Sequence, residues 1–311
     1  MGLDISIIIV TFNSSRCIRE CLDSILRQQG VGFEVLLVDN ASSDSTIEVV
    51  RAYDGRVRLF ANQENIGFGR GCNQGFSASH GRFVFMLNPD ASLTAKDSLA
   101  ELCRAMERHP EWGLAGTRVT EPDGSGESWP SPCYPDQHHV RCEFSRLPGK
   151  IAWVLGASMF IRREVFATVE GFDPGFFLTS EETDLCLRIR QQGWEIGFIP
   201  EVVVKHIGFA SEEGCDPYQT SLRRVRGIFR FWSKHYPAED VLKLVRRDRL
   251  RAGFRQRWYG ALACLQGPDS AAWRKHRQYL GISVASRQFL AQPFVLESAD
   301  PAALRSAGHI P

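Results

Sequence analysis

Continuous apolar runs alternate with amphipathic segments through the first 120 residues of the chain. The apolar runs are rich in β-branched residues and predict buried strands at 5–11, 33–38, 57–61, 83–87 and 113–119. Apolar residues at helical spacing predict helices after the polar residues 13–15 and 42–44, near the glycine-rich segment 65–75, and near 96–109. The alternation predicts an α/β fold with a mostly parallel central sheet and helices on both faces.

The pattern changes after residue 119. Residues 121–148 are rich in Pro, Gly, Ser and His, and predict a long loop of the kind that often binds ligands. Regular structure returns at 153–162, with a helix from Thr179 or Ser180 to about Gln192, strands near 195–199 and 202–206, and a helical, basic sequence from Pro217. We therefore expect three parts, at 1–118, 119–211 and 212–311.

The composition of the 311 residues is that of an ordinary globular protein. No apolar run approaches the ~18–20 residues of a bilayer-spanning helix, and the N-terminus lacks the basic and apolar regions of a secretory signal. The nine cysteines are scattered without the spacing of a zinc site. These features predict reduced thiols in a cytoplasmic protein.

Charge is unevenly distributed, although the net charge is only +1. Residues 223–257 contain twelve Lys or Arg against three Asp or Glu, interleaved with apolar residues such as Phe229 and Trp232. The segment either packs on the preceding domain with a solvated basic face, or contacts an anionic membrane peripherally. We favour packing. We expect no nucleic-acid partner, because no recognised nucleic-acid-binding module accompanies the charge.

Two acidic residues directly follow predicted strands. Asp90 ends the sequence Leu87-Asn88-Pro89-Asp90, and Asp39 follows the run 33–38. Open α/β sheets bind ligands at this edge, so Asp90 is placed to hold a divalent cation against a diphosphate, and Asp39 to accept the imide N–H of a uracil or thymine. His206, at the end of another strand, is either a structural hydrogen-bonding residue or a ligand of the same cation. Each acidic residue alone also fits an ordinary turn.

The segment from Asn65 to Gly75 contains four glycines and resembles a phosphate loop. Its position after the third strand does not fit the dinucleotide fingerprint, which follows the first strand of a βαβ unit. The glycines allow the backbone to approach a nucleotide, with Arg70 near the phosphates. A plain flexible loop is the alternative.

Three carboxylates, Glu181, Glu182 and Asp184, lie at the start of a predicted helix. A capping box of Thr179 with Glu182 and an ion pair of Asp184 with Arg188 would explain them structurally. The functional explanation makes Glu182 a general base for an acceptor hydroxyl, with a pKa raised by desolvation.

Taken in order, these segments resemble the family 2 glycosyltransferases of GT-A fold, and most closely their rhamnosyltransferase-like branch. The resemblance covers residues 4–235. It is carried by His206 and by the segments 7–13, 38–44, 65–68, 87–90, 156–159, 161–166, 171–173 and 181–188.

The resemblance implies roles for individual residues. Residues 1–118 would form a Rossmann-like half that binds the nucleotide sugar, and 119–211 the acceptor-binding and catalytic half. The nucleotide would contact Thr11, Asn13, Asp39, Asn65, Gly67, Arg70 and Asn88. Asp90 and His206 would hold Mg²⁺ or Mn²⁺ on the donor diphosphate, with Asn88 at the first position of a D-x-D-type motif. The acceptor would contact Trp153, Gly156, Ala157 and Asp184.

One position departs from the family, which usually has Glu-Asp where this chain has Glu181-Glu182. The longer side chain at the position of the catalytic base moves its carboxylate outward by about 1 Å, a shift that can slow a reaction substantially. Three explanations are open: the pocket is shaped for Glu182, Glu181 contributes, or activity is impaired. We favour the first.

The resemblance implies an inverting glycosyltransferase of cell-surface polysaccharide synthesis. Its donor is best assigned as dTDP-L-rhamnose, and its acceptor as a hydroxyl of a glycan or lipid-linked saccharide. One alternative is a UDP-hexose or UDP-N-acetylhexosamine donor, and another is that the protein is a non-catalytic homologue that binds a nucleotide sugar. The position of the glycine-rich segment disfavours an NAD(P)-dependent oxidoreductase. The protein would act in the cytoplasm or peripherally at the inner face of the plasma membrane.

Overall fold

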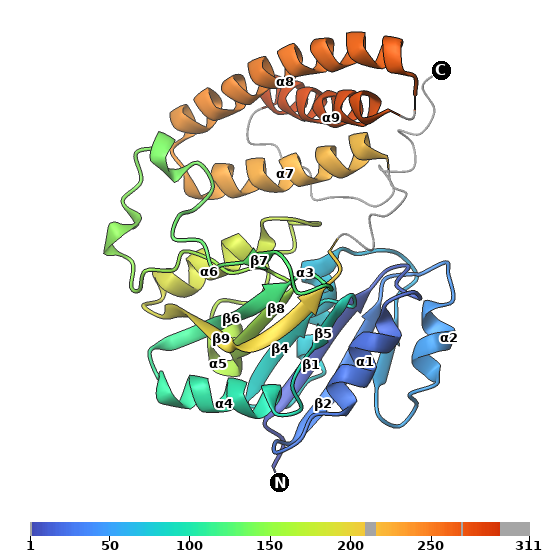
Figure 1. Cartoon of the computed structure of the whole chain (residues 1–311). Helices are drawn as coiled ribbons and strands as arrows, with labels where there is room; N and C mark the ends of the chain where they lie inside the picture. The colour runs from blue at the N-terminus through green and yellow to red at the C-terminus, as the bar shows by residue number, and fades with distance from the viewer. Residues whose placement is uncertain (1, 209–215, 269, 293–311) are drawn as a thin grey trace.

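One nine-stranded sheet forms the centre of the part of the chain described by the computed structural model, which is residues 2–208, 216–268 and 270–292 (Figure 1). The strand order is β3 (Arg58–Ala61), β2 (Phe33–Asp39), β1 (Ile5–Thr11), β4 (Phe83–Leu87), β8 (Ser158–Arg162), β6 (Trp112–Thr120), β9 (Glu195–His206) and β5 (Ala91–Leu93), with β7 (Glu127–Ser128) paired to β6.

The sheet is parallel in its first half and mixed in its second. Strands β3, β2, β1 and β4 run parallel, as the apolar runs predict, whereas β8 lies antiparallel between β4 and β6. The two strands expected at 195–199 and 202–206 form the single strand β9. Its pairing with β6 shifts register near Pro200, which lacks the N–H that a regular ladder needs.

Helices cover both faces of the sheet because successive side chains of a strand point in opposite directions. Ile7 and Ile9 of β1 pack with α1 (Ile18–Leu26), α2 (Thr46–Arg51) and α4 (Ser98–Arg108). Ile8 and Val10 pack with α3 (Phe68–Ser77), α5 (Arg163–Thr168) and α6 (Glu181–Gln191). This arrangement confirms the predicted α/β fold with two helical layers.

The polar residues 13–15 and 42–44, the expected caps of the helices after β1 and β2, are not at the N-cap positions, although Asp44 Oδ1 accepts a hydrogen bond from the Thr46 N–H at 3.0 Å. Helix α1 begins after Cys17 and α2 after Ser45, and neither N-cap side chain makes a capping hydrogen bond. The polar residues instead join the two loops to each other: the Ser15 N–H donates to Asp44 at 3.1 Å, and the Ser14 N–H donates to Thr46 Oγ1 at 2.8 Å.

The glycines of α3 allow this helix to lie close to β1. A Cβ atom at Gly75 would be 2.7 Å from Ile8 Cγ2, and one at Gly71 would be 2.9 Å from Val10 Cγ1. We expect Gly75→Val to lower the free energy of unfolding by about 1–3 kcal/mol, because the added side chain forces α3 away from the sheet. Urea denaturation measures the effect. Gly253→Ala is the control, since a Cβ there has no neighbour within 4 Å, and unchanged stability of Gly75→Val would contradict the close packing.

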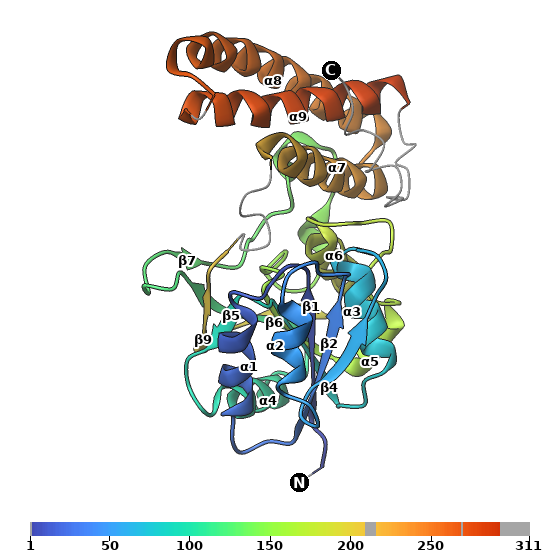
Figure 2. The ribbon, with the colours of Figure 1, turned by 90° about the vertical axis from the view of Figure 1, so that its right-hand side faces the viewer.

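The C-terminal extension is helical, as predicted. It consists of α7 (Pro217–His235), α8 (Ala238–Gln266) and α9 (Ala271–Ala291), stacked above the sheet (Figure 2). A third apolar cluster joins α7 to the segment that precedes β8, through Phe231, Tyr134 and Ala152 among others. Of the expected divisions, 118/119 falls inside β6, and 211/212 lies outside the described residues. No described helix is long and apolar enough to cross a membrane.

Candidate active site

The register between β5 and β9 brings Asp90 and His206 together from distant parts of the chain. Ala91 pairs with His206, and the Ile207 N–H donates to the Asp90 carbonyl at 3.1 Å. The Asp90 Oδ1 atom consequently lies 3.1 Å from His206 Nε2, and both side chains are partly exposed. The geometry therefore places a carboxylate and an imidazole at the edge where β4 ends.

Asn88 completes this group, because its Nδ2 atom lies 3.2 Å from His206 Nε2. No group of three or more His, Cys, Asp or Glu side chains within the described residues is arranged to hold a metal. Two donor atoms 3.1 Å apart are nevertheless close to the spacing of about 3 Å between neighbouring ligands of an octahedral Mg²⁺ site. The donor set therefore fits a cation that takes its remaining ligands from a diphosphate and water.

Asp39 lies at the ends of the parallel strands β1 and β2, where it pairs directly with Thr11. It is fully buried. Its Oδ1 atom accepts hydrogen bonds from Thr11 Oγ1 at 2.7 Å and from Ser42 Oγ at 2.6 Å, and its Oδ2 atom accepts from the Ser42 N–H at 2.9 Å. A carboxylate has about four lone-pair positions, so these three bonds fix its orientation and leave one position unused on a side chain that has no exposed surface.

Asn13 holds the loop after β1 against the loop after β2. Its backbone lies in the left-handed region at φ 52°, its N–H donates to Ser42 Oγ, and its Oδ1 atom accepts from the Ser43 N–H. The sequence reasoning missed Ser42 as the residue that orients both Asp39 and Asn13. The signal was available in the Asp-x-x-Ser spacing, which is typical of a side-chain turn.

The glycine-rich segment packs closely against the chain that precedes α6. The Gly67 backbone has φ 91°, and a Cβ there would lie 2.6 Å from the Phe177 carbonyl oxygen. Asn65 Oδ1 accepts a hydrogen bond from the Gly67 N–H, and Arg70 Nε donates to the Pro174 carbonyl. These residues connect α3 to the chain before α6, so close packing explains the glycines without a nucleotide.

Each of the two glutamates at the start of α6 has a buried carboxylate oxygen that lacks a hydrogen-bond partner in the described part of the chain. These atoms are Glu181 Oε2 and Glu182 Oε2. Burial raises the pKa of both carboxyl groups, and the neighbouring Glu182 charge raises the pKa of Glu181 further.

The expected capping box at this helix is wrong. The N-cap is Ser180, and its side chain makes no capping hydrogen bond. Thr179 and Ser180 both have left-handed backbones, at φ 75° and 72°, a conformation that costs energy in residues other than glycine and concentrates at functional sites. Helix α7 lies directly against this turn, since a Cβ at Gly227 would be 2.2 Å from the Thr179 carbonyl oxygen.

The segment before β8 connects the two groups of acidic residues. The Asn88 N–H donates to the Ala157 carbonyl at 3.0 Å, and a Cβ at the adjacent Gly156 would lie 3.5 Å from Glu182 Cβ. Gly156 thus lies beside the Glu182 side chain, at a distance where even an added Cβ would make only an ordinary van der Waals contact. Trp153, earlier in the same segment, is half-buried, and its indole N–H donates to the Cys133 carbonyl at 3.0 Å.

Asp184 is not available to an acceptor, contrary to the expectation. It is completely buried, and its carboxylate forms ion pairs with Arg188 Nε at 2.7 Å, Lys234 Nζ at 2.8 Å and His235 Nε2 at 2.7 Å. These contacts hold its pKa well below the usual range of an aspartate. The pairing with Arg188 is the one predicted from helical spacing, and the two contacts from α7 were not predicted.

The chain is similar in sequence to known proteins. Residues 6–169 match the family described as glycosyl transferase family 2. The chain is 27% identical over 243 residues to the N-acetylglucosaminyl-diphospho-decaprenol L-rhamnosyltransferase of Mycobacterium tuberculosis, an alignment that covers 68% of this chain and 78% of that protein.

Solved structures show the same fold at low identity. The mannosyltransferase PcManGT from Pyrobaculum calidifontis, in complex with GDP-Man and Mn²⁺, has a TM-score of 0.54 at 19% identity, over 98% of this chain and 79% of that chain. S. aureus TarS 1–349 in complex with UDP-GlcNAc has a TM-score of 0.55 at 16% identity, over 92% of both chains. The chain spans 43% of the longer TarS chain. These neighbours confirm the GT-A fold.

Proposed function

Because this chain belongs to glycosyl transferase family 2, we propose that it transfers a sugar from a nucleotide diphosphate donor to a hydroxyl of a lipid-linked saccharide. Our best assignment of the donor is dTDP-L-rhamnose. The observation that carries the proposal is the series of contacts from Asp90 and His206 through Asn88, Ala157 and Gly156 to Glu182.

The donor would lie along the ends of β1, β2 and β4. The remaining lone pair of Asp39 suits the imide N–H of thymine or uracil, and Thr11, Asn13 and Ser42 hold the surrounding loops in place. Asp90 and His206, with Asn88 beside them, would hold Mg²⁺ or Mn²⁺. Such a cation stabilises the negative charge that builds on a departing diphosphate.

Glu182 is the proposed general base. Its buried carboxylate, with one oxygen unpaired, is able to accept the proton of an acceptor hydroxyl that enters beside Gly156. The deprotonated hydroxyl oxygen then attacks the anomeric carbon as the bond to the diphosphate oxygen breaks, which inverts the configuration. Glu181, directly before it in the chain, is also buried, and burial together with the Glu182 charge raises the pKa of its carboxyl group.

The acceptor class follows from the relative in M. tuberculosis, whose name gives a decaprenol-diphosphate-linked N-acetylglucosamine as its acceptor. Trp153, Gly156 and Ala157 are the residues we assign to the acceptor side. A UDP-N-acetylhexosamine donor is the second candidate, supported by the UDP-GlcNAc complex of the TarS neighbour and by the imide N–H that uracil shares with thymine.

A thermal-shift screen of dTDP, UDP and GDP, with and without Mn²⁺, tests the donor site. At a nucleotide concentration of about 100 Kd, binding stabilises the native state by about 2.7 kcal/mol. We expect dTDP or UDP to raise the melting temperature more in the presence of Mn²⁺. In Asp90→Asn the additional effect of Mn²⁺ should disappear, because a carboxylate ligand is lost.

Asp123→Asn, in the exposed turn that follows β6, is the matched control for that prediction and should respond to Mn²⁺ like the wild type. An unchanged response of Asp90→Asn to Mn²⁺ would remove Asp90 from the metal site. A shift with GDP alone would contradict the assignment of Asp39 to a pyrimidine base.

A further inference from the structure

Helix α8 carries a row of exposed apolar side chains. Leu250, Phe254, Trp258 and Leu265 have 75%, 73%, 60% and 83% of their surfaces exposed. Their spacings of four, four and seven residues place them on one face of the helix. We define these four residues as the outer face of α8. Apolar side chains gathered on one surface mark a site of interaction more often than isolated ones do.

The outer face is exposed beside α9, whose Tyr279 and Ser283 line hollows together with residues of this face. The opposite face of α8 is buried through Val241, Leu244, Val245 and Ala252. Both views of the ribbon place α8 farthest from the sheet, with α9 and α7 between them (Figures 1 and 2). The outer face is therefore unpartnered within the described structure.

Arginines flank the outer face on both sides. Arg249, Arg251, Arg255 and Arg257 are exposed, and the sequence of α8 from 249 to 266 contains no Asp or Glu. The cations closer to the sheet behave differently, since Arg230 and Lys234 pair with Asp173, and Arg247 with Asp136. Four exposed arginines, on a stretch of helix without acidic residues, therefore surround the apolar row.

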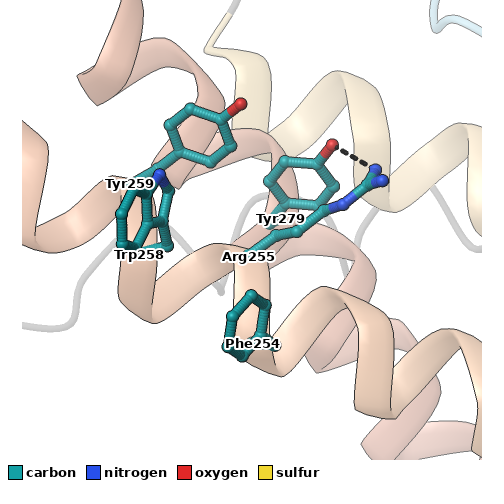
Figure 3. A pocket seen from close by; sticks show the side chains of 5 residues that line it. All are labelled: Phe254, Arg255, Trp258, Tyr259 and Tyr279. Carbon is teal, nitrogen blue, oxygen red and sulfur yellow. Dashed lines mark hydrogen bonds between the residues drawn. The ribbon is translucent and has the colours of Figure 1, made fainter.

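The surroundings of Phe254 and Trp258 are aromatic as well as basic (Figure 3). Both residues line a hollow together with Arg255, Tyr259 and Tyr279. Arg255 Nη1 donates to the Tyr279 hydroxyl at 2.8 Å, and the Tyr259 and Tyr279 rings stack with centroids 5.7 Å apart. Aromatic rings with a polar group beside them are enriched where apolar lipid meets water.

We propose that the outer face of α8 docks on the surface of an anionic bilayer. Phe254 and Trp258 enter the region between headgroups and acyl chains, and the flanking arginines bind lipid phosphates. A second copy of the chain is the weaker occupant, because two such faces would bring arginines against arginines. The helix lies in the plane of the membrane, in keeping with the absence of a membrane-crossing helix among the described residues.

The biological role of this docking rests on the proposed function, whereas the docking itself does not. A saccharide linked to a polyprenyl diphosphate is confined to the membrane, so docking of α8 would raise the local concentration of the acceptor. The test therefore measures docking separately from sugar transfer.

Sedimentation of the full chain with vesicles tests the docking. We expect binding to phosphatidylglycerol–phosphatidylcholine vesicles and little to phosphatidylcholine alone. Raising the salt from about 0.1 M to about 1 M should release the protein, because the Debye length falls from about 10 Å to about 3 Å. Equal binding to both vesicle types would overturn the proposal.

Two double variants distinguish the contributions of the charged and apolar residues. Arg249→Gln with Arg257→Gln should lower the partition coefficient by about five-fold for each charge removed. Phe254→Ser with Trp258→Ser should lower it at least as far, because the apolar anchors are lost. All four residues are exposed, so neither pair should affect folding. Arg51→Gln with Arg56→Gln, on and just after α2, is the charge-matched control and should bind like the wild type.

Two further measurements separate the outcomes. If Phe254→Ser with Trp258→Ser instead dissociates an oligomer, seen by light scattering, and leaves vesicle binding unchanged, the face joins two copies and the docking proposal fails. Transfer to a water-soluble acceptor analogue reports the proposed function alone. Loss of vesicle binding with normal transfer to that analogue supports the docking by α8.

Discussion

Glu182→Gln is expected to lower the turnover number for sugar transfer by about 10²–10⁴-fold and to leave the affinity for the nucleotide donor unchanged. The substitution keeps the size of the side chain but removes the group that accepts the acceptor proton. Donor affinity should persist, because the proposed donor contacts are made by Asp39, Asp90 and His206 and not by the start of α6. Single-turnover transfer and donor titration, measured on the same preparation, check both parts.

The pH dependence gives an independent readout of the same residue. A base must be ionised to act, and burial raises the pKa of Glu182. Activity should therefore rise with pH through a limb that lies above about 4.3, the ordinary pKa of a glutamate. The residual activity of Glu182→Gln should lack this limb.

Two matched variants decide between the glutamates. Glu181→Gln should retain most of the activity and keep the acidic limb, because burial, which raises the pKa of Glu182, is left unchanged. Glu182→Asp retains a carboxylate but withdraws it by one methylene group, so its activity should lie between those of wild type and Glu182→Gln. If Glu181→Gln loses activity and Glu182→Gln does not, the assignment of the base is wrong. If donor binding persists without turnover even in the wild type, the non-catalytic alternative is correct.

Asp184→Asn should lower the free energy of unfolding by about 3–5 kcal/mol, the cost of removing one partner from a buried ion pair. Asp184 is completely buried, and its carboxylate pairs with Arg188 on its own helix and with Lys234 on α7, and lies 2.7 Å from His235 Nε2. Its replacement leaves these two cations with a neutral partner. Urea denaturation of the full chain gives the difference.

The stabilisation by Asp184 should also depend on pH in a defined direction. Its pKa is lowered in the folded state, so its contribution is complete above about pH 4, the ordinary pKa of an aspartate, and is lost as the pH falls further. The difference in stability between wild type and Asp184→Asn should therefore shrink below about pH 4. Glu143→Gln, which removes an exposed ion pair with Arg146, is the control and should cost less than about 1 kcal/mol. A similar small cost for Asp184→Asn would contradict the role of this residue in joining α7 to α6.

Local sequence patterns predicted the features that depend on neighbouring residues. The apolar runs placed the parallel strands, and helical spacing predicted the pairing of Asp184 with Arg188. The resemblance to a family brought Asp90 and His206 together, and the structure confirms that they are in contact. The three-residue strand β5, which creates this contact, is too short to show any periodicity of its own.

Features that depend on tertiary packing were not predictable in this way. The glycines of α3 have the composition of a phosphate loop, but their partners are Ile8, Val10 and Phe177. The contacts of Asp184 with Lys234 and His235 join residues about 50 positions apart, and no local pattern identifies such a pair. The predicted capping residues of α1, α2 and α6 are not the N-cap residues with capping hydrogen bonds that were expected, since these polar residues join loops or adopt strained backbones.

The most direct test is a crystal structure of the full chain with dTDP and Mn²⁺. The positions of the strand ends predict that the pyrimidine ring lies against Asp39. They also predict that a diphosphate-bound Mn²⁺ contacts Asp90 and His206, in the part of the site that also contains Glu182. A nucleotide bound elsewhere, or a metal ion held without Asp90, would contradict the assignment of this edge as the active site.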